Sequence, residues 1–505
     1  MEKIVVSRDS DINDLDPQNF KSDAGYEAVE NLYNGLFDLE ARPGPGDTWR
    51  AASQDVVGEV VEDYELSEDG ITLTLHLRRG VRFSNGASCL ASSVKFTLER
   101  ALLGPGYLRP LMEMLTITES EQIHLLDDYT LELHLAHPTP LLWEILPLQS
   151  FSVLDPETTK THATSDDPWG SGWYRSHALG TGPYLLSQSK PGVEYVFERN
   201  PYYWRPGSVR NDGVVLKVIP SAKERLEALK RGHIDVVIGL QPRDLAPLED
   251  DPDLVVLSFP TTICKVMSMN TALVPFDDLR VRQAISYAIP YRQLQEEVMA
   301  GYCQPLTSPV PKGMPTHEGG FWVYDTDWER ARQLLAEAGY GQGFATSLIV
   351  RRPRADETLS AEAIQRALQV IGVQVELAKV SDAEYYARLK EFPLAIFETL
   401  SWVNDPIYHL LWNLKGDAPK NLANYRNARV DELIEDGMHE TDLHRRRVMS
   451  QEAQRIIVEE APWAFLYQPH WTVVTSSHVT GYAIYPDLLP RYRFLRKRSQ
   501  EAAGC

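Results

Sequence analysis

The chain has 505 residues, of which 43% are hydrophobic and 24% charged, and its formal net charge is −21. This is the composition of a folded globular protein, and the length predicts two or three domains instead of one core. The negative charge argues against a nucleic-acid-binding surface, and the sequence contains no run of about 18 apolar residues that would predict a membrane span.

The N-terminus and the cysteines bear on where in the cell the protein is located. The opening MEKIVVSRDSD does not predict a signal peptide, because its charged residues are not followed by a long apolar segment. Two interpretations follow: a cytoplasmic protein, or an exported protein in processed form with an added initiator Met. The four cysteines contain no CxxC pair, so no zinc or redox motif is predicted. Cys264 and Cys303 could form a disulfide, although unpaired buried thiols are the simpler interpretation.

The first third of the chain is rich in predicted strands. Residues 71–77 (ITLTLHL) and 129–135 (YTLELHL) alternate apolar and polar side chains, and IVVS near the N-terminus is a short apolar run. Between the two alternating strands, residues 91–103 carry apolar side chains at spacings that suit a packed helix. A looser connection rich in Trp and Gly follows at 166–182.

From residue 183 the pattern becomes that of an α/β unit. Residues 184–200 predict a hairpin and 214–220 a buried strand. Residues 221–232 then predict a short helix that ends at a glycine, and IDVVIGL (234–240) returns as a strand. This β–α–β order predicts a right-handed crossover.

Amphipathic helices dominate after residue 260. They are predicted at 278–289, 327–338, 361–371, 381–389, 430–438 and 444–461. A strand is expected at 373–380, and two late strands at 463–469 and 471–476. The whole pattern predicts a multidomain α/β protein.

The short patterns that resemble catalytic or metal-binding motifs lack the spacing or the partners that their chemistry needs. His439 and His444 are five residues apart, so on a helix they would lie about 140° apart and could not share a metal. Ser92 and Lys95 have the S-x-x-K spacing of serine β-lactamases, but K-T-G and S-D-N are missing. No glycine-rich loop precedes a helix. The sequence therefore predicts no reaction and no cofactor.

Eight stretches, taken in order, resemble one protein family. They are LDPQNF (15–20), NLYNGLFDLE (31–40), LRRGVRFSNGASCLASSVKFTLER (77–100), DDYTLELHLAHPTPLL (127–142), GTGPYLL (180–186), ERNPYYWRPG (198–207), ERLEALKRGHIDV (224–236) and DLRVRQAISYAI (278–289). Over nearly the whole chain they are similar to the peptide-, nickel- and opine-binding group of ABC-transporter solute-binding proteins, extracellular family 5. We expect the stretches themselves to serve the core and the turns.

The resemblance implies a fold and a role. The fold would be α/β, a two-lobed periplasmic-binding-protein-like fold (class II type, cluster C) with an additional small domain, closing on a ligand by a hinge motion. Lobe I would combine 1–40, 178–258 and 477–505, the small domain would be 41–177, and lobe II would be 259–476. Such a protein captures a solute and delivers it to a membrane permease without a cofactor, as a monomer in the periplasm, free or lipid-anchored.

The resemblance also gives a role to an acid in an apolar stretch. Asp405 lies in ETLSWVNDPIYHLLW (398–412), where an unpaired buried carboxylate would lose its hydration. In dipeptide- and oligopeptide-binding members an Asp just after a Trp pairs with the α-ammonium of the peptide, and Trp402 and Asp405 match that pattern. Two alternatives stay open: a local salt bridge, for example to Lys415 or Arg426, and a turn residue before the following proline.

Three arginines follow the apolar strand LIV, in Arg-Arg-Pro-Arg (351–354). Dipeptide-binding members carry Arg-Pro-Tyr here, and its Arg holds the carboxylate of the peptide. That match gives Arg352 the carboxylate role, whereas Arg354 stands where the Tyr would be. If the arginines face the ligand, they predict a more anionic ligand than a dipeptide, such as a phosphate- or multi-carboxylate-bearing conjugate. The alternative is a solvated loop.

Two further contacts are predicted from the resemblance. The loop Asp23-Ala24-Gly25-Tyr26 matches the place where backbone groups of relatives touch the ligand, which makes Gly25 and Tyr26 candidates. Tyr107, in LGPGYLRP, is a candidate aromatic wall from the small domain, or an ordinary packing residue of its loop.

The favoured function is capture of a short peptide or peptide-like zwitterion. An opine or sugar-phosphate conjugate is the alternative, and a metal chelate ranks last because His409 and His470 are not at ligand spacing. The rival class is a cytoplasmic ligand-sensing protein or an enzyme on the same fold. The missing signal supports that class, but the chain has no basic extension of the size of a DNA-binding domain.

Overall fold

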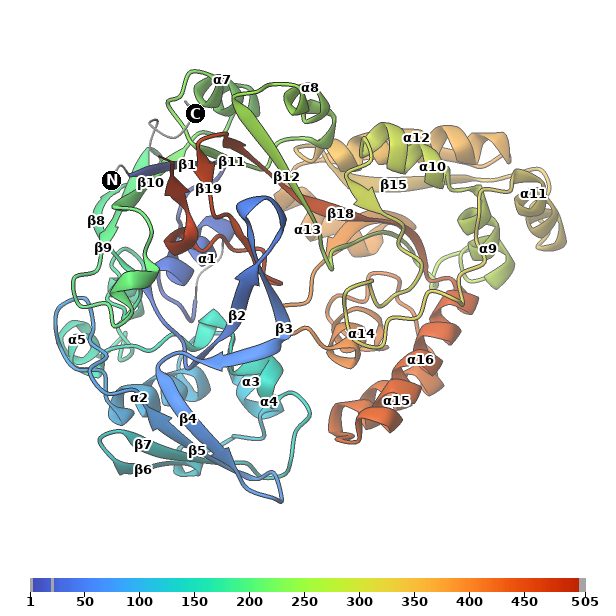
Figure 1. Cartoon of the computed structure of the whole chain (residues 1–505). Coiled ribbons are helices and arrows are strands. Elements are labelled where there is room, and N and C mark those ends of the chain that lie inside the picture. The colour runs from blue at the N-terminus through green and yellow to red at the C-terminus, as the bar shows by residue number, and fades with distance from the viewer. Residues whose placement is uncertain (1–2, 20–21, 499–505) are drawn as a thin grey trace. The chain divides into compact units, whose positions relative to one another are not determined.

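The computed structural model describes residues 3–19 and 22–498, which form two compact units (Figure 1). Unit 1 comprises Met1–Leu240, Leu248–Leu257 and Val473–Cys505, and unit 2 comprises Gln241–Pro247 and Ser258–Thr472. The strands β12 (Leu254–Pro260) and β18 (Trp463–Ser476) each contribute residues to both units. The predicted division into two lobes and a small domain stays a prediction.

Unit 1 is built on a mixed sheet. The short apolar strand β1 (Ile4–Arg8) pairs in parallel with β10 (Gly213–Val218) and β11 (Val236–Ile238), so the helix between the last two makes the predicted β–α–β crossover. The predicted hairpin, β8 (Tyr184–Lys190) and β9 (Glu194–Arg199), pairs antiparallel and joins β10.

A second, antiparallel sheet in unit 1 has the order β4-β5-β7-β6, and its inner strands β5 and β7 show the predicted alternation of buried and half-buried side chains. Helix α2 packs on β6 and β7 (Figure 1). The strands are β4 (Val61–Leu66), β5 (Thr72–Leu77), β6 (Ile123–Asp127), β7 (Thr130–His134), and elsewhere in the unit β2 (Phe37–Pro43), β3 (Trp49–Gly58), β19 (Val479–Thr480), β20 (Ala483–Ile484) and β21 (Arg496–Lys497). The helices are α1 (Asp23–Leu32), η1 (Pro45–Asp47), α2 (Ala91–Leu103), α3 (Arg109–Met114), η2 (Ser120–Gln122), α4 (Leu142–Ile145), η3 (Gln149–Phe151), α5 (Pro156–His162), α6 (Ser171–Tyr174), η4 (Pro206–Ser208), α7 (Ala222–Lys230) and η8 (Tyr492–Phe494).

Unit 2 has a sheet in the order β16-β15-β17-β13-β18, covered by helices whose apolar sides form one core with the strands. The strands are β13 (Cys264–Met269), β14 (Cys303–Gln304), β15 (Ala345–Arg351), β16 (Gln374–Val380) and β17 (Leu394–Thr399). The helices are α9 (Leu279–Ala288), α10 (Tyr291–Gln293), η6 (Leu294–Val298), α11 (Trp328–Glu337), α12 (Ala355–Val370), α13 (Asp382–Arg388), η7 (Leu389–Glu391), α14 (Pro406–Leu414), α15 (Ala428–His439) and α16 (Leu443–Glu460), with η5 (Pro242–Asp244) and α8 (Ala246–Glu249) near the unit boundary.

Two of the differences from the predictions concern β18 and α1. The segments 463–469 and 471–476 are one continuous strand, β18, because Pro469 is accommodated within it: its carbonyl oxygen accepts a hydrogen bond from the Thr261 hydroxyl at 2.6 Å. The predicted loop 23–26 is the first turn of α1, because Ser22 is its N-cap and accepts a hydrogen bond from the Gly25 N–H at 3.1 Å.

Several of the stretches that resemble the family contact one another at the C-terminal end of α1. Gly182 N–H donates to the Leu32 carbonyl at 3.1 Å, and a Cβ at Gly180 would lie 2.3 Å from the same oxygen. The Asn200 side chain donates to the Gly182 carbonyl at 2.9 Å, and the Trp204 indole N–H donates to Asn34 Oδ1 at 3.1 Å. The glycines are thus required by close backbone approach, and these stretches serve the turns and the packing as expected.

The C-terminal segment completes the core of unit 1. Tyr492 donates a hydrogen bond to Glu27 of α1, and Arg491 pairs with Glu30 at 2.8 Å. Arg493 pairs with Asp38 of β2 at 2.9 Å. The side chains of these three C-terminal residues are nearly inaccessible to solvent, so charged groups near the N-terminus depend on residues more than 450 positions later.

The cysteines and the helices add two observations. Cys89 and Cys264 are buried free thiols and Cys303 is a half-buried one, and Cys505 lies outside the described residues. Among the helices of residues 3–19 and 22–498, we find none with the length and apolar character needed to cross a membrane.

Candidate functional site

Asp405 is buried and already paired within unit 2. It is the N-cap of α14, 3% exposed, and its Oδ1 accepts a hydrogen bond from the Tyr408 N–H at 2.9 Å. The guanidinium of Arg446, on α16, binds both carboxylate oxygens, with 2.7 Å from Nη2 to Oδ1. A charge-assisted bidentate pair of this kind satisfies a desolvated carboxylate.

Lys415 and Arg426, the partners suggested for a local salt bridge of Asp405, were therefore wrong, because its partner is Arg446. Lys415 pairs with Asp417 at 2.7 Å and Glu435 at 3.1 Å, whereas the partner of Asp405 lies 41 positions along the chain. Trp402, in the link between β17 and α14, is half-buried. The ligand-binding roles of Trp402 and Asp405 stay predictions, and the Arg446 pair weighs against the role of Asp405 as an ammonium acceptor.

The stretch around Asp405 also buries a histidine. His409 is fully buried, and its Nδ1 lies 2.7 Å from the Ser401 hydroxyl. Burial lowers the pKa of His409 to about 4, so the imidazole is neutral at physiological pH. Within the described residues, His, Cys, Asp and Glu side chains form no group of three that could hold a metal ion.

The three arginines between β15 and α12 have different environments. Arg351 is 5% exposed and binds the buried Glu357 through Nε and Nη2, with Nε 3.0 Å from Oε2. Arg352 is exposed and donates to the Lys379 carbonyl at 2.8 Å. Arg354, the N-cap residue of α12, is exposed, and its guanidinium forms no ion pair or hydrogen bond with any other residue that the structure describes. Arg351 thus stabilises the fold, and Arg354 is the uncommitted cation.

A charged cluster that sequence reasoning missed lies beside this loop. Lys265 of β13, whose side chain is 1% exposed, lies 2.8 Å from Asp356, 3.2 Å from Glu357 and 2.9 Å from Glu398. The Lys265 ammonium lowers the pKa of the Glu398 carboxyl to about 2, with burial opposing and Arg354 adding to the lowering. Glu398 keeps a third of its side chain exposed although it pairs with Lys265, so an ionised, partly exposed carboxylate and the Arg354 guanidinium lie on the same part of unit 2.

The signal for this cluster was present in the sequence. Lys265 lies in the apolar strand CKVMSM and Glu398 in LAIFET, and the two are directly opposite each other in the β13–β17 ladder. A single charge in an apolar strand is the same signal that drew attention to Asp405, but the pairing of two distant strands cannot be read from either strand alone.

In unit 1 the structure brings together two of the predicted residues. The Tyr26 and Tyr107 hydroxyls are 3.3 Å apart, and Tyr107 is 47% exposed. Gly25 is buried within α1, and its N–H is used by Ser22, so this N–H is not available to a ligand. The ligand contacts predicted for Gly25, Tyr26 and Tyr107 stay predictions.

A buried ion pair holds the Tyr107 loop against the N-terminal segment. Arg100 of α2 binds both oxygens of Asp16, with 2.8 Å from Nη1 to Oδ1, and also donates to Gln18 Oε1 at 3.0 Å. A Cβ at Gly106 would lie 2.7 Å from the Gln18 carbonyl oxygen, so the loop before Tyr107 can approach this closely only without a side chain.

The sequence profile of bacterial extracellular solute-binding proteins, family 5, matches residues 55–421. The chain belongs to this family. As a family 5 protein it has the substrate-binding role that its resemblance implied. Its relatives include the glutathione-binding protein GsiB of Salmonella choleraesuis, 26% identical over 499 residues that cover 96% of this chain and 92% of the relative.

Solved structures of other binding proteins match this family 5 protein along its length. The periplasmic binding protein DppA from Helicobacter pylori, in complex with the peptide STSA, is 24% identical with a TM-score of 0.82 and covers 98% of each chain. NikA from Brucella suis, in complex with Fe(III)-EDTA, is 23% identical with a TM-score of 0.86 and covers 99% of this chain and 100% of NikA. These matches establish the periplasmic-binding-protein fold, but they do not identify the ligand.

Proposed function

We propose that this protein captures a small peptide or peptide-like zwitterionic solute in the periplasm and delivers it, as a monomer, to the permease of an ABC importer. The observation that carries the choice of ligand is the uncommitted Arg354 guanidinium beside the ionised, partly exposed Glu398 carboxylate. Adjacent opposite charges suit a ligand that itself carries a carboxylate and an ammonium group. The names of GsiB and DppA, with glutathione and a peptide, support the same class.

An anionic ligand, such as an opine or a sugar-phosphate conjugate, is the second candidate. One observation favours it: Asp405, the predicted ammonium acceptor, is occupied by Arg446. If no other carboxylate accepts a ligand ammonium group, the ligand would be bound by the exposed Arg352 and Arg354 only, which suits an anion.

Thermal-shift measurement on the whole chain, after unfolding and refolding to remove carried-over ligand, tests both candidates. The panel contains glutathione, dipeptides to pentapeptides, opines and sugar phosphates. A ligand at 100 times its Kd adds about 2.7 kcal/mol to the free energy of unfolding, which is a clear rise in Tm.

Two variants and a control then assign the roles. Arg354→Met is expected to weaken binding of either ligand class, Glu398→Gln only that of zwitterions, and Arg332→Met, an exposed arginine of α11, neither. Binding of sugar phosphates or opines without any peptide binding would contradict the zwitterion proposal and support the second candidate.

A further inference from the structure

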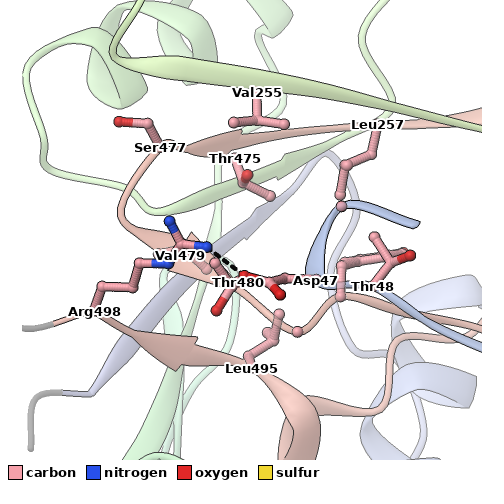
Figure 2. A pocket seen from close by; sticks show the side chains of 13 residues that line it. Asp47, Thr48, Val255, Leu257, Thr475, Ser477, Val479, Thr480, Leu495 and Arg498 are labelled. Carbon is pink, nitrogen blue, oxygen red and sulfur yellow. Dashed lines mark hydrogen bonds and ion pairs between the residues drawn. The ribbon is translucent and has the colours of Figure 1, made fainter. Parts of the chain in front are cut away.

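A pocket of about 110 Å³ in unit 1, with walls from η1, β12, the end of β18 and the C-terminal segment, gives no indication of a ligand (Figure 2). Its two charged side chains, Asp47 and Arg498, pair with each other, and each is about half exposed to solvent. The link between β17 and α14 in unit 2 supports a stronger inference, because hydrogen bonds fix it at both ends.

Two side chains of α14 hold the start of this link, which comprises residues 400–404. The Thr399 hydroxyl, at the end of β17, donates a hydrogen bond to Asn413 Oδ1 at 2.9 Å. The Ser401 hydroxyl lies 2.7 Å from Nδ1 of His409. His409 and Asn413 are one helical turn apart, and the Asn413 amide also donates to the His409 carbonyl at 2.8 Å. Both residues are buried, so these bonds form away from water, where hydrogen bonds are stronger.

The far end of the link is fixed as well. Asp405 caps α14 and is held by Arg446 of α16. Within the link Val403 is fully buried, and the half-buried Trp402 stands in the sequence between it and Ser401. The backbone of Trp402 is therefore restrained in the absence of a solute.

The link also continues from a residue that the proposed function uses. Glu398 and Thr399 are neighbours in β17, so their side chains point to opposite faces of the sheet. Glu398 pairs with Lys265, whereas Thr399 bonds to Asn413 of α14. The chain thus runs directly from Glu398, which the proposed function pairs with an ammonium group, towards Trp402, and α14 sets the conformation of the stretch between them.

His409 can hold the link without adding a charge. Burial lowers its pKa to about 4, so at physiological pH the ring has one nitrogen that donates and one that accepts. The Ser401 hydroxyl can do either. The bond between them therefore does not compete with the ion pairs of Asp405 and Lys265.

We propose that His409 is a positioning residue for the transported solute: its hydrogen bond to Ser401 holds Trp402 in the conformation that contacts the solute. This rests on the proposed function and on the predicted solute contact of Trp402. A link that is already held in its bound conformation does not have to be ordered when the solute binds, and this preorganisation increases affinity. Loss of the hydrogen bond should therefore lower the affinity about fivefold.

The first test reports on the link without any solute. The full chain, which contains 11 tryptophans, is labelled with 5-fluorotryptophan, and Trp402→Phe assigns the fluorine NMR signal of Trp402. His409→Leu removes the partner of Ser401 and should shift or broaden that signal. His409→Asn should restore it, because an Asn amide places a donor and an acceptor near the position of Nδ1. Ser308→Ala, which removes another buried serine hydroxyl of unit 2, should leave the signal unchanged.

The second test measures affinity by calorimetric titration with glutathione and with trialanine. His409→Leu and Ser401→Ala should each bind about fivefold more weakly than the unmodified chain, whereas His409→Asn and Ser308→Ala should bind as it does. If the two groups act through one bond, the double variant Ser401→Ala/His409→Leu should lose no more affinity than His409→Leu alone. Independent effects on the fold would add.

An unmoved Trp402 signal in His409→Leu, an unchanged affinity in that variant, or an additive loss in the double variant would each overturn the proposal. Ser401→Ala gives the same fluorine test if His409→Leu does not fold. If neither peptide binds the unmodified chain, the proposed function fails for peptides, and the fluorine signals still decide whether His409 positions Trp402.

Discussion

Two charged groups of residues in unit 2 differ in how completely their charges are satisfied. Asp405 and Arg446 form a closed pair, in which both side chains are buried and the carboxylate also caps a helix. Around Lys265 the charges are shared among several side chains, Glu398 stays partly exposed, and Arg354 has no partner in the described chain. The first group is thus closed within the fold, whereas the second keeps a partly exposed carboxylate and a guanidinium without a partner in the described chain.

Breaking the closed pair should have the largest effect. Arg446→Met leaves the buried Asp405 carboxylate without its cation, which typically costs about 3–5 kcal/mol of the free energy of unfolding. Chemical denaturation of the variant and of Arg447→Met, an exposed neighbour on the same helix, measures the difference. A loss below about 1 kcal/mol in Arg446→Met, or an equal loss in both variants, would show that the pair is not closed in this way.

The pH dependence of stability should separate the two regions. The pKa of His409, beside Asp405, is lowered to about 4, so the folded state binds fewer protons than the unfolded state between pH 4 and the ordinary pKa of 6.5. The stability that neutral His409 contributes is present above pH 6.5 and is lost as the pH falls towards 4, by up to about 3 kcal/mol.

Glu398 should titrate in a lower window. Its pKa is lowered from 4.5 to about 2, so its contribution is present above pH 4.5 and is lost as the pH falls through 2. Urea denaturation at several pH values should show that His409→Gln flattens the upper window and Glu398→Gln the lower one. A variant that flattens the other window, or neither, would contradict these assignments.

The smallest effect on stability is expected at the uncommitted cation. Arg354→Met should change the free energy of unfolding by no more than about 0.5 kcal/mol, as is usual for exposed positions. Its affinity for the transported solute should nevertheless fall at least tenfold, because a charge-assisted hydrogen bond is worth about 1.5–3 kcal/mol. Denaturation and calorimetric titration of the same preparation compare the two quantities. Lost stability with unchanged affinity would make Arg354 a residue of the fold, like Arg351.

Local sequence patterns predicted the elements well and the charge partners poorly. Helix α2 was predicted with its observed bounds, and the hairpin of β8 and β9 followed from two apolar runs around a Pro-Gly turn. The Arg446 partner of Asp405 could not be predicted, because any of many arginines could meet a given acid once helices pack. The three arginines of 351–354 look equivalent in sequence, and only the burial of Glu357 distinguishes Arg351 from the other two.

The contacts of the C-terminal segment also affect the order in which the two units can fold during synthesis. Unit 2 is almost complete once residue 472 has been synthesised, whereas Glu27, Glu30 and Asp38 wait for the residues around Arg491 that satisfy them. Because domains tend to fold as their chain segments emerge, unit 2, which ends at Thr472, can fold before unit 1, which also needs the segment after residue 472. Unit 1 cannot complete the ion pairs of Glu30 and Asp38 until Arg491 and Arg493 have left the ribosomal exit tunnel.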